Sequence, residues 1–258
     1  MADANDPRAR LELLELLWRG GQRPSRGPKP KLTLDQIAQA AISLADAEGL
    51  DALSMQRVAT ELGYTTMSLY RYVSGKDQLV ELMTDKAAGD PPPYTGDPAD
   101  WRAELEAWVH ALWELYLRHP WTLRAQLSTP PAGPHQLAWF EAALRPLTRA
   151  GLTGGDAISA TLLLLAAVRQ FAGFAVDMTA GRARAGLTTE ESEAGYDAAL
   201  REFVDPDRYP ALTALIGDGV FQPTGLPDSG IGLDLDFGVH RVLDGIESYV
   251  RARREQGP

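Results

Sequence analysis

Apolar residues recur three and four positions apart through most of this chain, and that spacing limits its fold more than any other feature. Leu34, Ile37, Ala38, Ala41 and Leu44 are one example. The spacing gathers apolar side chains on one face of a helix, whereas a half-buried strand needs strict alternation. No stretch of the sequence alternates convincingly in that way. The sequence therefore predicts an all-α protein.

Glycine and proline divide the chain into parts. RGGQRPSRGPKPK at 19–31 and GDPPPYTGDP at 89–98 hold too many of both to form regular elements. We expect an N-terminal helix and arm over 1–31, a three-helix helix-turn-helix domain with a following helix over 32–89, and a larger helical domain over 98–254. The spacing predicts helices at 11–18, 33–49, 54–63, 66–72, 74–89, 98–118, 121–128, 134–150, 153–180, 189–204, 207–217 and 236–254.

Two helix starts carry capping signals. Thr33 is followed three residues later by Gln36, which has the form of a capping box. The helix that begins near Ser74 has Asp77 in the corresponding place, so we expect Asp77 to be its cap partner.

Composition excludes several kinds of chemistry. The chain has no cysteine, which rules out disulfides, thiolate metal sites and cysteine nucleophiles. Its histidines, at 110, 119, 135 and 240, lack the spacing of metal ligands, and no phosphate-binding loop or nucleophile elbow is present. We therefore expect no metal, no cofactor and no enzymatic activity. The main rival to DNA binding is a helical protein-interaction module.

The sequence also gives no sign of a membrane or secretory role. The first ten residues lack a basic start followed by an apolar stretch, and the longest apolar run, Leu162–Val168, is too short to span a bilayer. We expect a cytoplasmic protein with no membrane partner.

Charge is distributed unevenly along the chain. The net charge is −10, yet Arg19, Arg23, Arg26, Lys29 and Lys31 lie in one segment that contains no acid. The position of positive charge, rather than the total, decides where a polyanion binds. This basic arm is either a DNA contact or a solvated tail. We expect folding to survive removal of residues 1–31.

Residues 54–73, SMQRVATELGYTTMSLYRYV, form the pattern most informative about function. Two short helices are predicted on either side of Gly63, with Ala59 at their crossing. The second helix keeps an outer face rich in hydroxyl and aromatic groups, as a helix that enters a major groove requires. An ordinary helical hairpin would show the same spacing, so the pattern alone leaves both interpretations open.

Residues Thr33 to Met83 resemble the N-terminal domain of the TetR family of transcription regulators. The resemblance is carried by IAQAAISLADAEGLDALSMQRVATELG and SLYRYVSGKDQL. It implies phosphate contacts from Ser54, Ser68, Tyr70, Tyr72 and Lys76, with Thr33 a further candidate, and base contacts from Gln56, Thr66, Met67 and Arg71. Tyr70 could equally pack between helices, and Arg57 and Arg71 could be plain surface charges.

The C-terminal part is rich in aromatic residues, which at helical spacing are more often core than ligand site. Polar groups set among them favour a small-molecule site. The candidate ligand-binding residues are Trp108, His110, Leu112, Gln126, Thr129, Trp139, Gln170 and Phe174.

This part more weakly resembles tetracycline-repressor-type C-terminal domains, in LRHPW, TLLLLAAVRQFAGFAVD and LDFGVHRVLDGIESYV. The resemblance implies a homodimer whose long and last helices form a four-helix bundle. The residues expected to face that bundle are Leu163, Val168, Val239, Leu243, Ile246 and Val250. Gln126 replaces a ligand-binding histidine, so a magnesium–tetracycline ligand is disfavoured and an apolar or aromatic effector is expected. The function predicted is a repressor that such a ligand releases from a palindromic operator.

Overall fold

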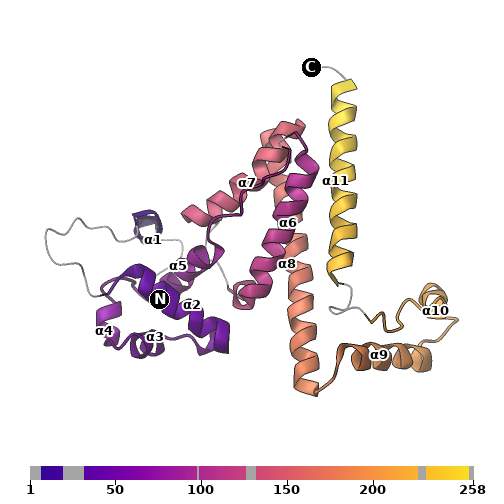
Figure 1. Cartoon of the computed structure of the whole chain (residues 1–258), viewed down its shortest axis with the longest axis horizontal. Coiled ribbons are helices and arrows are strands. Elements are labelled where there is room, and N and C mark those ends of the chain that lie inside the picture. Colours follow the sequence, from indigo (N-terminus) through magenta and orange to yellow (C-terminus); the bar gives the residue numbers. More distant parts are fainter. Residues whose placement is uncertain (1–6, 20–31, 98, 126–131, 226–230, 256–258) are drawn as a thin grey trace. The chain divides into compact units, whose positions relative to one another are not determined.

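The structure is a computed structural model that describes residues 7–19, 32–97, 99–125, 132–225 and 231–255. Every regular element in these ranges is helical, which confirms the all-α prediction (Figure 1). The elements are α1 Pro7–Arg19, α2 Leu34–Glu48, η1 Leu50–Ala52, α3 Met55–Glu61, α4 Thr66–Leu69, α5 Lys76–Ala88, α6 Trp101–Arg118, η2 Pro120–Leu123, α7 Pro134–Ala150, α8 Gly154–Ala185, α9 Thr189–Phe203, α10 Pro210–Gly217 and α11 Ile231–Glu255.

The chain forms two compact units. One comprises residues 1–165 and 250–258, and the other comprises residues 166–249. Helices α8 and α11 each contribute to both units. The basic arm after Arg19 lies outside the described residues.

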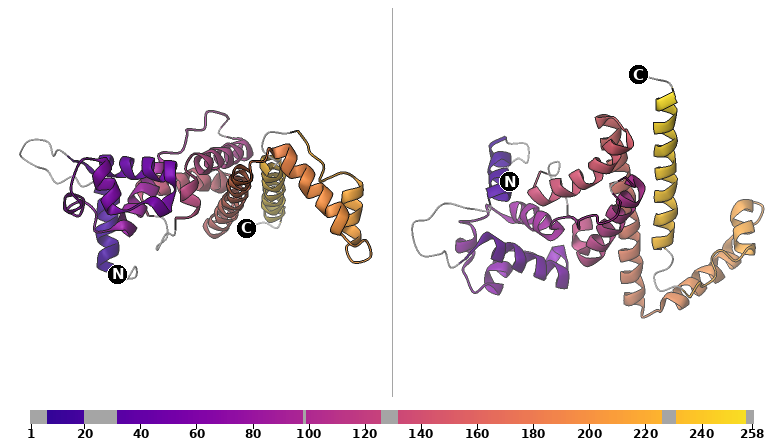
Figure 2. Two further views of the ribbon diagram at one scale, coloured as in Figure 1. Left: turned by 90° about the horizontal axis from the view of Figure 1, so that it is seen from below. Right: turned by 45° about the horizontal axis from the view of Figure 1, so that its top comes forward.

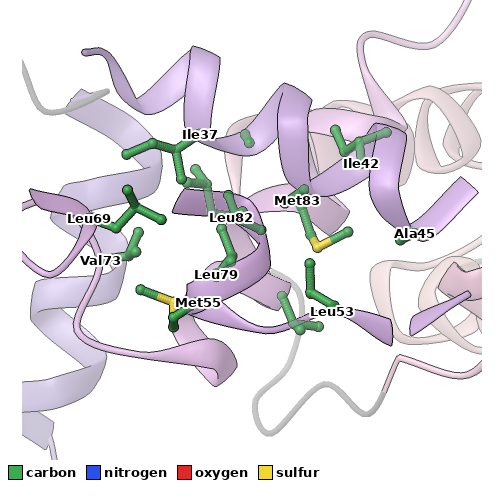
Figure 3. Packing of buried hydrophobic residues seen from close by; sticks show 14 of the residues in the cluster. Ile37, Ile42, Ala45, Leu53, Met55, Leu69, Val73, Leu79, Leu82 and Met83 are labelled. Carbon is green, nitrogen blue, oxygen red and sulfur yellow. The ribbon is translucent and has the colours of Figure 1, made fainter. Parts of the chain in front are cut away.

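Helices α2 to α5 enclose one hydrophobic core (Figure 3). The predicted capping box is present at the start of α2, because the Thr33 hydroxyl accepts from the Gln36 N–H and the Gln36 side chain accepts from the Thr33 N–H. Pairing these orphan groups fixes where the helix begins. The core side chains that are fully or almost fully buried include Ile37, Ala41, Val58, Leu69, Val73, Leu79, Leu82 and Met83.

The turn between α3 and α4 depends on Gly63. Its φ of 72° lies in the left-handed region, which glycine adopts without steric cost. Helix α4 ends at Leu69 and is shorter than the predicted 66–72. The chain then turns so that the Tyr72 hydroxyl donates to the Leu32 carbonyl oxygen at 2.8 Å. This bond anchors the end of the helix-turn-helix to the residue before the N-cap of α2.

The predicted cap of α5 is wrong by one residue. The N-cap is Gly75 rather than Ser74, so the third helical position is Gln78 rather than Asp77. The Gln78 side chain accepts from the Ser74 N–H at 2.6 Å. An amide that reaches back in this way satisfies one of the donors left over at a helix start.

Helix α1 is part of the folded structure rather than a dispensable extension. Leu17 is buried in the same core as α2 to α5, and Leu13 and Leu16 pack against that core. The Trp18 indole N–H donates to the Ala132 carbonyl oxygen at 2.8 Å. These contacts count against the expectation that folding survives removal of residues 1–31.

Two carboxylates connect helices α2 and α5 to the helices that follow them. Asp46 of α2 accepts from the Trp121 indole N–H at 2.7 Å and lies 2.8 Å from His119 Nδ1. Asp85 of α5 accepts from the His135 and Gln136 backbone N–H groups at 3.1 and 3.0 Å. Asp85 therefore satisfies the first turn of α7.

The predicted helix over 121–128 is a short 3-10 helix over Pro120–Leu123. The Thr122 hydroxyl donates to the His119 carbonyl oxygen, and the Arg124 N–H bonds the Trp121 carbonyl. Hydrogen bonds between residues three positions apart give this turn the tighter winding of a 3-10 helix. Residues 126–131 lie outside the described part of the chain.

Helices α8 and α11 lie side by side and run in opposite directions (Figures 1 and 2). Arg253 Nη1 near the end of α11 is 3.1 Å from Asp156 Oδ2 near the start of α8. By length and composition α8 could cross a membrane, with a mean hydropathy of 1.6 over its most apolar window. Only 28% of that window is buried in the single chain, so most of its apolar surface remains uncovered.

The residues predicted to face the bundle differ in how far the single chain already buries them. Leu163 is exposed, as a bundle-facing residue would be. Ile246 is half-buried. The remaining bundle candidates are already buried within the single chain: Val168, Val239, Leu243 and Val250. The reason is that one face of each helix is used by packing inside the chain. The exposed large apolar side chains on these helices are Ile158, Leu162, Leu163, Phe174, Met178, Phe237 and Tyr249.

Candidate functional site

The outer face of α3 and α4 presents several of the predicted contact residues to solvent. Gln56 of α3 is exposed, as is Arg71 after α4. Met67 is 73% exposed and Tyr70 is 47% exposed, although apolar and aromatic groups of this size are normally covered. Thr66 is half-buried at the start of α4. The helix-turn-helix therefore leaves these predicted contact residues exposed to solvent.

The hydroxyl groups near this face have different freedom to donate. Ser54 caps α3 by accepting from the Arg57 N–H at 3.2 Å, which leaves its own proton available. Ser68 Oγ lies 3.0 Å from Thr65 Oγ1, and either can be the donor. Thr33 Oγ1 lies 3.3 Å from Gln36 Oε1, so its proton already has an acceptor within the cap. Ser54 and Ser68 are therefore better placed than Thr33 to donate to a phosphate oxygen.

Two polar side chains near the face are committed to other partners. The only hydroxyl proton of Tyr72 is donated to the Leu32 carbonyl, so this group cannot donate to a phosphate at the same time. The geometry favours a structural role for Tyr72 over the predicted phosphate contact. Arg57 makes two bonds to the Glu48 carboxylate, at 2.6 and 2.8 Å. The Glu48 carboxylate raises the pKa of Arg57, and the hydrogen bond from Arg57 lowers the pKa of Glu48.

Lys76 is exposed at the start of α5, close in sequence to the helix-turn-helix. Lys86, near the other end of the same helix, lies 2.8 Å from Asp35 Oδ1. Lys86 is thus neutralised within the domain.

A second candidate site is a cavity of about 270 Å³ in the unit that contains α6 and α7. The predicted ligand residues Trp108 and Trp139 both line it. The two indole rings meet edge to face with centroids 6.4 Å apart, and the Trp108 indole N–H donates to the Trp139 carbonyl oxygen at 2.9 Å. The other lining residues are Pro91, Pro92, Pro93, Tyr94, Thr95, Glu104, Ala107, Ala142 and Arg145.

A buried acid and Arg145 form the charged part of this wall, and Arg149 bonds the same acid from outside it. Glu104 is 4% exposed and accepts from Arg145 Nη2 at 3.0 Å and from Arg149 Nη2. Burial of the carboxylate is tolerated because both arginines hydrogen-bond to it. Burial, followed by the nearby carboxylates of Asp100 and Glu104, raises the pKa of Tyr94, so its phenol stays neutral at neutral pH.

Trp139 also touches the end of α5. Its indole N–H lies 3.1 Å from the Ala88 carbonyl oxygen and 3.0 Å from that of Gly89. These carbonyls belong to the last turn and C-cap of α5, where a helix leaves acceptors unpaired. One side chain therefore contacts both the cavity and the helix that follows the helix-turn-helix.

Two of the remaining predicted ligand residues, His110 and Leu112, do not line this cavity although they belong to the same unit. Leu112 is buried elsewhere on α6, and His110 is exposed. Gln170 and Phe174 are exposed on α8, in the other unit. Gln126 and Thr129 lie outside the described residues. The prolines were missed because the segment over 89–98 was interpreted only as a boundary, although consecutive prolines beside an aromatic residue could have indicated a rigid wall.

Comparison with known proteins places both parts of the chain. Residues 37–83 match the family described as "Bacterial regulatory proteins, tetR family", and residues 93–250 match "Tetracyclin repressor-like, C-terminal domain". The chain belongs to the TetR family. It is therefore a DNA-binding transcriptional regulator with a TetR-type N-terminal domain and a ligand-binding type of C-terminal domain.

Individual relatives agree with this assignment. Over 246 residues the chain is 42% identical to the HTH-type transcriptional repressor DrrR1 of Streptomyces coeruleorubidus, covering 93% of this chain and 87% of that TetR-family protein. It is 27% identical over 136 residues to the class A tetracycline repressor protein from transposon 1721 in Escherichia coli, covering 52% of this chain and 62% of that protein. These relatives are transcriptional regulators rather than enzymes.

Solved structures show the same fold. The TetR family protein ActR of Streptomyces coelicolor, in complex with actinorhodin, superposes with a TM-score of 0.68 at 26% identity, covering 84% of this chain and 95% of ActR. A second regulator from the same organism, SCO7222, gives a TM-score of 0.65 at 26% identity, covering 84% and 98% of the two chains.

Proposed function

We propose that this chain is a cytoplasmic homodimeric repressor that binds a palindromic operator and releases it when a small apolar or aromatic molecule occupies the C-terminal domain. The observation that carries the proposal is the uncovered face of α3 and α4, where Gln56, Met67 and Arg71 stand exposed on a fully packed core. Exposed side chains on a rigid recognition element are what base reading requires.

The roles of the individual side chains follow from their chemistry. Gln56 suits adenine, Arg71 suits guanine or a phosphate, and Met67 suits a thymine methyl group. Thr66 is the remaining candidate for base contact. Phosphate contact is assigned to Ser54, Ser68, Tyr70 and Lys76, because each offers a donor near the helix-turn-helix. Thr33 and Tyr72 remain weaker candidates, since their hydroxyl protons have acceptors within the chain.

The proposed homodimer is supported by the uncovered apolar surface of α8. Leu163, Phe174 and Met178 are exposed on this helix, and water contact of large apolar groups is unfavourable. A second copy would cover them and would give the protein the two-fold symmetry that a palindromic operator matches. Light scattering that shows a monomer at micromolar concentration would contradict this part of the proposal.

A small aromatic effector is supported by the cavity beside Trp108 and Trp139 and by the likeness to ActR, whose structure holds actinorhodin. Rigid aromatic walls with few polar groups are typical of sites for small molecules.

The proposed function is tested by selecting DNA from a random pool with the full-length protein. The expected result is an inverted repeat whose half-sites are separated by a whole number of helical turns. Failure to enrich any sequence at low salt would contradict the function itself.

Point variants then test the roles of single residues. Lys76→Ala should weaken binding to all sequences alike and lower the salt slope by about one unit, because a phosphate contact carries no base information. Lys86→Ala is the matched control, since the same charge is removed from the same helix but Lys86 is paired with Asp35.

Gln56→Ala should relax preference at one base pair per half-site, at a cost of about 1–3 kcal/mol. Identical specificity profiles for the Lys76 and Gln56 variants would overturn the assignment of roles.

A further inference from the structure

The cavity between the Pro91–Thr95 segment and helices α6 and α7 has an apolar, rigid wall. Proline fixes its own backbone φ, so consecutive prolines form a stiff surface. On the other side lie the rings of Trp108 and Trp139, both buried and each held by an indole hydrogen bond. A volume of about 270 Å³ exceeds the ~150 Å³ that accommodates one benzene ring. Fused aromatic rings fit such a space.

The polar part of the wall contains one buried acid and one arginine. Glu104 is the only acid and Arg145 the only arginine among the residues that line the cavity. Arg149, which does not line the cavity, also bonds Glu104, so two guanidinium groups hold this carboxylate and it does not depend on Arg145 alone. The nearby acids Asp97 and Asp100 are exposed and accept from the Ala99 and Ala103 backbone N–H groups.

Arg145 is positioned to meet an anionic group in the cavity. It lines the cavity, its side chain is 53% exposed, and its pairing with Glu104 uses Nη2. A guanidinium has five N–H donors in a planar arrangement that suits a carboxylate or another planar oxyanion. A cationic ligand would instead meet Arg145 with a charge of the same sign.

We propose that this cavity binds a planar aromatic molecule that bears one anionic group, with its rings against Trp108 and Trp139 and its anion at Arg145. The assignment rests on the proposed function, because it identifies the site and chemical class of the effector. It adds Arg145 as the residue that determines charge preference. Because Trp139 also bonds the Ala88 and Gly89 carbonyls, a ligand stacked on this ring acts directly on the end of α5.

The test compares two probes that share an aromatic frame and differ in charge. 1-Anilinonaphthalene-8-sulfonate carries one anionic group, and N-phenyl-1-naphthylamine has the same rings without it. Each is titrated by fluorescence into the full-length protein and into Arg145→Gln, Arg145→Lys and Arg118→Gln. Arg118 is the matched control, because it is an exposed arginine at the end of α6 that does not line the cavity.

Loss of a charge-assisted hydrogen bond predicts at least a tenfold weaker affinity of Arg145→Gln for the sulfonate. The affinity of this variant for the neutral amine should stay within about twofold. Arg145→Lys keeps the charge and should lose less, and Arg118→Gln should bind both probes normally. Equal loss of both probes, or no loss of the sulfonate, would overturn the proposal. If Arg145→Gln does not fold, as thermal melting would show, Arg145→Lys is measured alone. Equal losses of affinity for the sulfonate and the neutral amine in that variant would overturn the proposal.

The two proposals fail separately. Probe binding is measured without DNA, so charge-dependent binding together with no selected DNA would reject the proposed function and leave the cavity assignment standing. Selected DNA together with probe binding that does not depend on Arg145 would reject the cavity assignment and leave the proposed function standing.

Discussion

Helices α2 and α8 both carry apolar residues at helical spacing, yet they differ in how the fold covers them. The apolar face of α2 is enclosed by α3 and α5, and Ile37 and Ala41 have no exposed surface. Helix α8 encloses Leu164, Val168 and Ala172 in the same way but leaves Leu163 more than half exposed. The chain by itself covers the apolar core of the DNA-binding domain, whereas the exposed apolar surface of α8 needs a second chain to cover it.

The largest effect is expected in the enclosed core. Leu79→Ala should lower the free energy of unfolding by about 2–5 kcal/mol, because it leaves a cavity among fully packed side chains. Urea denaturation measures the loss. Leu163→Ala removes the same atoms from an exposed position, so its effect should depend on protein concentration, whereas that of Leu79→Ala should not. Concentration-independent and equal losses would erase the distinction between the two helices.

A charge placed on the uncovered surface should act on association. Leu163→Glu should raise the dissociation constant of the dimer by about 100-fold, because a charge without a partner would be buried between subunits. Analytical ultracentrifugation measures that constant. Leu11→Glu introduces the same charge at an exposed leucine of α1 and should change it little. If both variants associate like the parent protein, α8 is not the interface.

The buried acid at the junction of α5 and α7 should make stability depend on pH. Burial raises the pKa of Asp85, with the Gln136 backbone N–H opposing that shift. An acid with a raised folded-state pKa binds its proton more tightly when folded, so stability rises as the pH falls through that pKa. Relative to Asp85→Asn, the parent protein should therefore become more stable as the pH is lowered from neutral into the acidic range, as pH-dependent denaturation measures. Parallel pH profiles of the two proteins would contradict the expected titration.

The smallest effect is expected at the exposed ion pair of α2 and α3. Glu48→Gln should change the free energy of unfolding little, because exposed pairs gain little in water. Thermal melting at low and high salt measures the change. A larger and salt-sensitive loss would show that Arg57 positions α3 through this pair.

Much of the fold could be predicted because its helices are determined locally. The spacing around Ile37, the capping residues Thr33 and Gln36, and the glycine at 63 act within a few residues. The end of α4 could not be predicted in this way, because it is set by the bond of Tyr72 to Leu32 across 40 positions. The shift of the α5 cap from Asp77 to Gln78 is a smaller case, in which two neighbouring polar residues compete for one donor.

The candidate site was predictable only in part, for a related reason. A recognition face depends on short-range spacing, so Gln56, Met67 and Arg71 could be identified from the motif. The cavity depends on pairs that are distant in sequence, such as Glu104 with Arg145 and Trp139 with Ala88. Periodicity shows that α6 and α7 exist, but it does not show which faces meet. Trp108 and Trp139 were found because they are aromatic, and Arg145 was missed because charged residues on helices are usually solvated.

Gly133 has a consequence for which substitutions the gene tolerates. A side chain there would collide with the carboxylate of Asp85, which holds the first turn of α7. Every replacement begins with the same first carbon atom, so different codon changes at this position should give one shared phenotype. In a collection of variant alleles, position 133 would stand out as intolerant, although it belongs neither to the DNA-facing residues nor to the walls of the cavity.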